Sequence, residues 1–329
     1  MPLRHLVVYV DPKSRTSPLP ILERFEDYIT FEVVDWDYAD AYSEAPPDMA
    51  SESIHADPRN RKLVGEQLKF YEDCMRFYRR RNWKGWITLH DTDEYVSINP
   101  LARNADAGIH LPGVPSNTEP GSVMKWLQMT MGHRVERRGS HTPCVGVPRM
   151  QFCTEDAEPA TSSTTSQLGP GFEDRDFSTL RWSSFPKKDG HRAPKNLVYV
   201  GGIDAEYFEN VDMLSNGARP HDVMPGVCES HRVLKGSPFQ IYHYSGTQEQ
   251  RDFRADPRGQ FGNRPGSPPA DDCGPPKDRI RVDDVKPWLG AFVEKVGRAE
   301  AARLLQGVGK VSGWPEYAGR TPRTIGRQI

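Results

Sequence analysis

The chain has 329 residues, of which 36% are hydrophobic and 27% charged, and its formal net charge is -2. This composition can bury a sizeable core and excludes a disordered chain, while the near-neutral charge gives no basic face for nucleic acid. No run approaches the ~18 apolar residues of a membrane span, and the N-terminus MPLRHLVVYVDP is not expected to be a signal peptide because its apolar run is too short.

The first third of the chain alternates between strand-like and helix-like segments. β-branched runs predict strands over 5–10 and 31–36, apolar residues at helical spacing predict helices over 20–29 and 61–81, and WITL predicts a strand over 86–89. This order is typical of a parallel sheet covered by helices. We therefore expect an α/β fold with a mostly parallel, twisted central sheet and helices on both faces.

The rest of the chain has longer loops, in keeping with its 28 glycines and 29 prolines. The Ser/Thr/Gly-rich residues 155–176 and the Pro/Gly-rich residues 256–277 are expected to be flexible loops. No repeat or linker divides the chain, so residues 1–329 are predicted to form a single domain that ends in a helical tail. Elements are expected here in the order helix 121–132, strands 144–152, 195–202 and 239–246, and helices 282–296 and 298–307.

The five cysteines contain no CxxC pair, which argues against a zinc site of the usual spacing. Because their number is odd, at least one thiol is unpaired within a monomer. One or two disulfide bonds are compatible with the count.

An apolar strand leads into an acidic cluster in GWITLHDTDEYVSI, residues 85–98. Ligands of open α/β sheets bind beyond the carboxyl ends of strands, where Asp91 and Asp93 fall. In extended backbone these two carboxylates point the same way, and His90 points away to pack behind them. Two carboxylates that share one side need a cation between them, and Mg²⁺ or Mn²⁺ prefers such oxygen ligands. The pattern predicts a metal site for a diphosphate; the alternative is a solvated acidic turn.

Two enzyme classes use a D-x-D cluster with a metal ion. In phosphohydrolases of the aspartyl-phosphate class the first Asp is a nucleophile on the first strand, and Thr or Val stands two residues after the second Asp. Here that position holds Tyr95, and two predicted strands come earlier. The order favours the second class, nucleotide-sugar transferases, in which D-x-D holds the metal on the donor diphosphate.

The segment EQLKFYEDCMRFYRRRNWKGWITLHDTDEYVSIN resembles the core signature of glycosyltransferase family 92. That family's Gln, the Cys of the next helix, the Trp before the strand and its D-x-D-E-aromatic end correspond to Gln67, Cys74, Trp83 and residues 91–95. HLVVYVDPKS resembles the family's strand and turn, and FQIYHYSGTQEQRDFRADPRG resembles its closing His-Tyr segment. The resemblance therefore spans residues 6–259, with gaps.

The resemblance implies a GT-A fold, a UDP-sugar donor with galactose favoured, Mn²⁺ (or Mg²⁺), a glycan acceptor and inversion at the anomeric carbon. It also implies the secretory-pathway (Golgi) lumen. The family opens with an earlier strand and turn, so this chain is expected to be divergent or truncated at its N-terminus. A third hypothesis is a non-catalytic, glycan-binding descendant of the fold.

The expected metal ligands are Asp91, Asp93 and His243, because a third ligand from the C-terminal part is common in this fold. His243 ends the strand FQIYH, whereas its rivals His221 and His231 lie in less ordered stretches. The alternative for His243 is an ordinary histidine with a satisfied hydrogen bond.

The expected nucleotide contacts are Asp11, Gln67 and Asp91. Asp11 follows the first strand, although Asp-Pro is also a turn starter, and Gln67 lies on the long helix that precedes the acidic cluster. Glu94 is expected to bind the acceptor or to hold other groups of the site. The best candidate for the base that deprotonates the acceptor is Glu229, and the other admissible carboxylates are Asp222, Asp204 and Asp156.

Overall fold

The computed structural model describes twelve parts of the chain, namely residues 5–10, 17–27, 29–34, 58–99, 127, 144–152, 184–187, 191–203, 239–244, 275–282, 285–304 and 323–325. Their elements are, in chain order, β1 (His5–Tyr9), α1 (Leu19–Leu22), the 3₁₀ helix η1 (Glu23–Phe25), β2 (Thr30–Val34), α2 (Pro58–Arg80), β3 (Trp86–Thr88), β4 (Glu94–Ile98), β5 (Cys144–Gln151), β6 (Ser184–Pro186), β7 (His191–Tyr199), η8 (Val200–Gly202), β8 (Phe239–His243), η10 (Pro276–Asp278), β9 (Arg279–Arg281), α9 (Val285–Val296), α10 (Arg298–Leu304) and β10 (Arg323–Ile325). None of the helices in these parts is long and apolar enough to cross a membrane.

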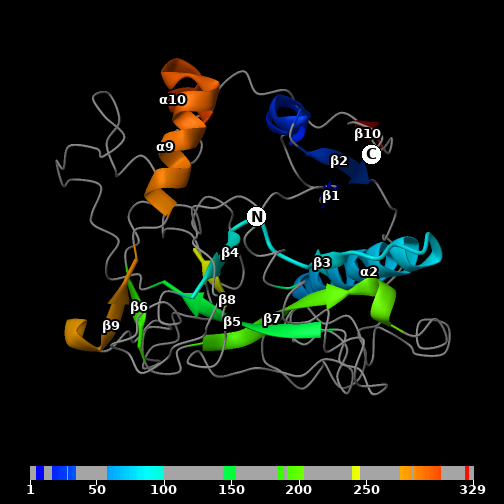
Figure 1. Cartoon of the computed structure of the whole chain (residues 1–329), viewed down its shortest axis with the longest axis horizontal. Helices are drawn as coiled ribbons and strands as arrows, with labels where there is room; N and C mark the ends of the chain where they lie inside the picture. Colours follow the sequence, from blue (N-terminus) through cyan, green and yellow to red (C-terminus); the bar gives the residue numbers. More distant parts are fainter. Residues whose placement is uncertain are drawn as a thin grey trace.

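The described strands form three sheets, and the fold is mixed α/β (Figure 1). A five-stranded sheet has the order β3-β7-β5-β8-β4, a three-stranded sheet the order β1-β2-β10, and β6 pairs with β9. The expected parallel pairing occurs between β1 and β2 and between β5 and β8.

The prediction of a mostly parallel central sheet is wrong for the described strands. In the five-stranded sheet, β3 and β5 both run antiparallel to β7, and β4 runs antiparallel to β8. The long helix α2 leads from β2 to β3, but these two strands belong to different sheets. The strand-helix-strand order along the chain therefore does not form the parallel unit that it usually indicates.

Most predicted elements in the described parts have a counterpart. The helix expected over 20–29 is a short α-helix that continues as a 3₁₀ turn, and α2 begins slightly before its predicted start. The strand β4 was missed because the acidic cluster that opens it does not resemble a strand. Of the helix expected over 121–132 the structure describes Leu127, which is helical. Residues 155–176 lie outside the described residues, as do most of residues 256–277.

One face of the five-stranded sheet is covered by α2. Tyr71 and Met75 of this helix pack with Leu89, Cys144 and Val198 in one buried cluster. Figure 1 shows α2 running beside β3 and β7. The helix has the apolar spacing that such burial requires, because positions 71 and 75 lie one turn apart on the same side.

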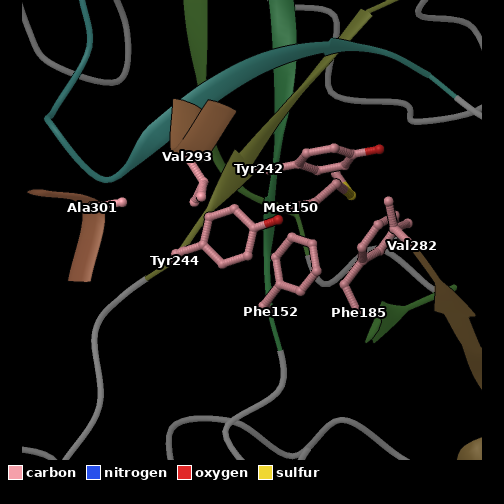
Figure 2. Packing of buried hydrophobic residues seen from close by; sticks show 8 residues of the cluster. All are labelled: Met150, Phe152, Phe185, Tyr242, Tyr244, Val282, Val293 and Ala301. Atoms are coloured by element: carbon pink, nitrogen blue, oxygen red, sulfur yellow. The ribbon is translucent and has the colours of Figure 1, made fainter. Parts of the chain in front are cut away.

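The C-terminal helices cover the same face further along, where aromatic side chains gather (Figure 2). Phe152 and Tyr244 stack with ring centroids 4.4 Å apart, and Tyr242 meets Phe152 edge to face. Val293 of α9 and Ala301 of α10 close this cluster. The buried aromatic area fixes the helical tail to the sheet.

The opposite face carries a third cluster, which includes Ile98, Leu127, Val147, Leu197 and Ile241. Side chains alternate between the two faces of a strand. Leu197 and Ile241 therefore point away from their neighbours Val198 and Tyr242, which lie under α2 and α9. The helical Leu127 packs on this second face.

The link between β3 and β4 joins the two edges of the five-stranded sheet. Four inter-strand spacings amount to about 19 Å, and the chain from Thr88 to Glu94 can reach only about 20 Å when fully extended. Part of this link is folded in a turn, so the sheet must curl to bring its edges together. The curl brings the acidic link to Lys195 of β7 and to the end of β8.

Candidate functional site

The acidic cluster forms a turn between β3 and β4. The backbone N–H of Glu94 donates to the carbonyl of Asp91 (3.1 Å), so residues 91–94 are not in the extended conformation that the sequence analysis assumed. The backbone N–H of Tyr244 donates to the carbonyl of Asp93 (3.0 Å) and ties the turn to the end of β8. The turn is therefore held by the sheet rather than standing free in solvent.

A buried lysine lies beneath this turn. Lys195 of β7 places its Nζ 3.3 Å from Asp91 Oδ2 and 3.1 Å from Glu94 Oε2. Its side chain is 0% exposed, so this ammonium group reaches no solvent. A buried charge must be paired and hydrogen-bonded to be tolerated, and here two carboxylates do this.

Glu94 is the most heavily coordinated carboxylate of the site. It accepts from Arg149 Nη1 (3.2 Å) and from the backbone N–H of Asp91 (3.2 Å), in addition to the contact with Lys195. Its side chain is also 0% exposed. Of the two roles expected for Glu94, holding other groups therefore suits this position, whereas contact with an acceptor does not.

Asp91 is held from a second side by the long helix α2. Gln67 donates from Nε2 to Asp91 Oδ1 and also to the hydroxyl of Tyr71 (2.9 Å). Burial and the Asp91 charge raise the pKa of Tyr71 well above its usual range, so its phenol stays protonated. With Gln67 on one oxygen and Lys195 on the other, the Asp91 carboxylate has a fixed orientation.

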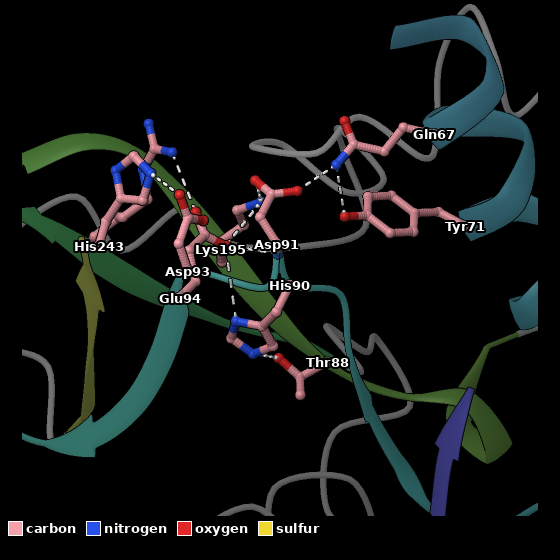
Figure 3. Close-up of polar contacts among 10 residues, drawn as sticks. Gln67, Tyr71, Thr88, His90, Asp91, Asp93, Glu94, Lys195 and His243 are labelled. Atoms are coloured by element: carbon pink, nitrogen blue, oxygen red, sulfur yellow. Dashed lines mark hydrogen bonds and ion pairs between the residues drawn. The ribbon is translucent and has the colours of Figure 1, made fainter. Parts of the chain in front are cut away.

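Asp93 faces His243 instead. Asp93 Oδ2 lies 3.6 Å from His243 Nε2, and both side chains are partly exposed. Figure 3 shows the Asp93 carboxylate directed toward His243 and the Asp91 carboxylate directed toward Gln67. His243 pairs in register with Glu94 across β8 and β4, which fixes the height of its ring along the sheet.

His90 packs behind the turn, as its position in the sequence predicted. Its Nε2 contacts Thr88 Oγ1, and its Nδ1 lies 3.8 Å from Glu94 Oε2. Burial, helped by the charge of Lys195, lowers the pKa of His90 to about 3. The ring is therefore neutral at physiological pH despite the nearby carboxylate.

The fold thus brings the predicted residues Gln67, Asp91, Asp93, Glu94 and His243 into one site. The other predicted residues lie outside the described parts of the chain, namely Asp11, Glu229, Asp222, Asp204, Asp156, His221 and His231.

Two cations of the site were missed by sequence reasoning. Lys195 opens the run KNLVYVGG and Arg149 lies within CVGVPRMQF, and each is a charged residue inside a segment that reads as a buried strand. A charge inside an apolar strand is the signal that could have found them, because such a residue is rarely buried without a partner.

The fit of the predicted metal ion can be tested on the donors present. Within the described residues no group of three or more His, Cys, Asp and Glu side chains forms a metal cluster. Both oxygens of Asp91 already accept from Gln67 and Lys195, which leaves Asp93 and His243 as a facing pair. Mg²⁺ and similar ions are often held by one or two carboxylates together with the phosphates of a substrate. The pair suits an ion of that kind.

The chain was also compared with known proteins. It matches no protein-family model, no curated protein and no solved structure. The case for its function therefore rests on the sequence and on the geometry of this site.

Proposed function

We propose that this chain is a metal-dependent glycosyltransferase that moves a hexose, with galactose favoured, from a UDP-sugar to a glycan acceptor with inversion. The observation that carries the proposal is the pair Asp93 and His243, which face each other across the end of the sheet beside a firmly held Asp91. A carboxylate and an imidazole in this setting can take a divalent ion whose remaining ligands come from a diphosphate.

Asp93 and His243 would hold Mn²⁺ or Mg²⁺. When bound, such an ion supplies Lewis-acid stabilisation of the charge that develops on the leaving diphosphate. Asp91 is oriented by Gln67 and Lys195, and we assign it to the nucleotide rather than to direct metal binding. The assignment follows from Lys195, because an ammonium group 3.3 Å from Asp91 Oδ2 repels a second cation there.

The contacts of Asp91 also bear on the phosphohydrolase alternative. A nucleophilic carboxylate must turn an oxygen toward phosphorus, whereas hydrogen bonds from Gln67 and Lys195 fix the orientation of the Asp91 carboxylate. In addition, Tyr95 stands where that class has Thr or Val, and β1 and β2 come before β3 along the chain. These two observations favour the transferase.

The proposal is tested by calorimetry of UDP binding in the presence and absence of Mn²⁺, together with a UDP-release assay over a panel of UDP-sugars. We expect Mn²⁺ to strengthen UDP binding to the wild-type chain, and Asp93→Asn to remove most of that gain, about 10- to 100-fold in Kd, since an amide binds a divalent ion poorly. Asp73→Asn is the matched control. Asp73 pairs with Lys69 on the surface of α2, so this change should leave UDP binding intact.

Other outcomes decide against the proposal. Glycan binding without UDP binding would identify a non-catalytic descendant of the fold. A Mg²⁺-dependent phosphatase activity that is lost in Asp91→Asn would identify the phosphohydrolase. An Asp93→Asn variant that keeps the full Mn²⁺ effect would make the acidic turn a purely structural feature.

A further inference from the structure

Arg149 is a second feature of the site with a capacity for ligand binding. It belongs to β5 and pairs in register with Ile241 of β8, two residues before His243. Residues two apart on a strand share a face, so Arg149 and His243 lie on the same side of neighbouring strands. The guanidinium therefore lies at the same end of the sheet as the acidic turn.

Among the described residues, the Arg149 guanidinium has one hydrogen-bond partner, Glu94. Its Nη1 donates to Glu94 Oε1 at 3.2 Å, and its buried Nε has no partner in the described parts of the chain. A guanidinium carries five N–H donors arranged as a fork, which usually grips a carboxylate through two nitrogens at once. Here the contact with Glu94 uses one nitrogen, although the residue is only 9% exposed. A buried orphan donor of this kind calls for an explanation.

Arg149 is not the sole partner of Glu94. The same carboxylate accepts from Lys195 and from the backbone N–H of Asp91. Lys195 differs from Arg149 because its Nζ contacts two carboxylates and its side chain is fully buried. The Arg149 side chain is 11% exposed, so part of it is open to a ligand.

The charges of the site change sign when a divalent ion is added. The fixed charges of the site are the cations Lys195 and Arg149 and the carboxylates of Asp91, Asp93 and Glu94, which together leave it one unit negative. A divalent cation on Asp93 and His243 would leave it one unit positive. Of the two fixed cations, Arg149 is the one with donors to spare, and guanidinium groups recognise phosphate oxygens well.

We propose that Arg149 binds the diphosphate of the nucleotide through the donors that Glu94 leaves free. This inference rests on the proposed function for the identity of the nucleotide, but the anion site at Arg149 can be tested without it. The ligand class is a diphosphate, whether part of UDP or free as inorganic pyrophosphate. Glu94 then has a second task, which is to orient the guanidinium.

The experiment measures the binding of uridine, UDP and inorganic pyrophosphate by calorimetry, once with Mn²⁺ and once in EDTA. We expect Arg149→Met to weaken UDP and pyrophosphate about 10- to 100-fold under both conditions and to leave uridine unchanged, because a charge-assisted hydrogen bond is lost. Arg76→Met is the matched control. Arg76 also pairs with one glutamate (Glu72, 2.8 Å) and also has an unpartnered Nε, but it lies on α2.

A double variant separates phosphate binding from support of Glu94. If Arg149 served only to neutralise Glu94, the combination of Arg149→Met with Glu94→Gln would restore UDP binding, and this result would overturn the inference. Unchanged UDP affinity in Arg149→Met alone would overturn it too. If the double variant remains weak, Arg149 contacts the ligand. A wild-type chain that binds pyrophosphate through Arg149 but not UDP refutes the proposed function and leaves the anion site standing. A wild-type chain that binds neither refutes both.

Discussion

At the scale of single residues, the site depends on a buried charge network. Lys195 and Glu94 are both fully buried, and each contacts a further charged group of the site. Such pairs add little net stability, because desolvation offsets much of their attraction, but removing one partner leaves an uncompensated buried charge. The network is therefore better understood as fixing the position of the acidic turn than as stabilising the whole fold.

His90 should make the stability of the protein depend on pH. Its pKa is about 3 in the folded chain, through burial first and the charge of Lys195 second, against 6.5 for the unfolded chain. Above pH 6.5 both states are neutral and the contribution is complete. Below pH 6.5 the unfolded state binds the proton more readily, so stability falls as the pH approaches 3. We expect a loss of roughly 2–3 kcal/mol between pH 6.5 and 4.5 from this residue.

Urea unfolding of the wild-type chain and of His90→Gln over this pH range checks the expectation. In the variant, the free energy of unfolding should lack the part of its pH dependence that comes from His90, while the contributions of the other titrating groups remain. The readout is the difference between the two pH profiles, so a constant offset from the lost contact with Thr88 does not affect it. Parallel profiles would mean that the folded chain accommodates the charged ring.

The sequence predicted most of the site but missed its two cations, Lys195 and Arg149, and the reason lies in chain distance. Asp91, Asp93 and Glu94 were found because they are adjacent in sequence and follow a strand. His243 was placed by resemblance, and its approach to Asp93 depends on the pairing of β8 with β4. Lys195 reaches the turn only because the link from β3 crosses over β7. No local pattern encodes a contact between residues about a hundred positions apart.

At the scale of elements, the junction between α9 and α10 depends on one backbone conformation. Gly297 has a φ of 84° and ends α9, and its N–H donates to the carbonyl of Val293 (3.0 Å). α10 begins at the next residue, so the two helices are joined with no loop. A left-handed residue at this position lets the chain change direction at once.

Gly297→Ala should destabilise the fold by about 1 kcal/mol, because a side chain disfavours positive φ. A Cβ at this position meets no other atom within 4 Å, so strain alone is tested. Gly297→Asn is the matched variant and should lose clearly less, since asparagine tolerates this conformation, as Asn82 does in this chain with a φ of 54°. Thermal unfolding of the wild-type chain and the two variants measures their order of stability. Equal melting temperatures would contradict the expectation.

Elements with strong periodicity were predicted well, whereas their pairing was not. α2, β5, β8 and α9 lie close to their expected positions because each buries a continuous apolar side. The direction of each strand is decided by the links between strands, and the sequence of a strand does not record it. The parallel order of β1 and β2 was correct because a helix connects them directly, whereas β3 joined another sheet.

At the scale of the whole molecule, the two faces of the five-stranded sheet have different tasks. α2, α9 and α10 bury one face, and their clusters include large aromatic residues. The charged side chains Lys195, Glu94 and Arg149 share the other face with an apolar cluster, at the end where the acidic turn crosses. The helix α2 also reaches the site, because its Gln67 donates to Asp91, so the packed helix helps to hold the charges of the site in fixed positions.

A disulfide bond at Cys144 should couple this sheet to the redox state of the surroundings. Cys144 lies in β5, between β7 and β8, and is buried and disulfide-bonded, whereas Cys74 is a free buried thiol whose pKa burial raises. Opening the bond should lower stability by about 2–4 kcal/mol, since a crosslink restricts the unfolded chain. Reductant should therefore lower the urea midpoint of the wild-type chain but not that of Cys144→Ser. Cys74 should stay unreactive to a thiol reagent until unfolding, because the thiolate is the reactive form. A wild-type midpoint that reductant leaves unchanged would show that the bond does not stabilise the fold, and the sheet would then tolerate a reducing compartment as well as the oxidising one implied by the family resemblance.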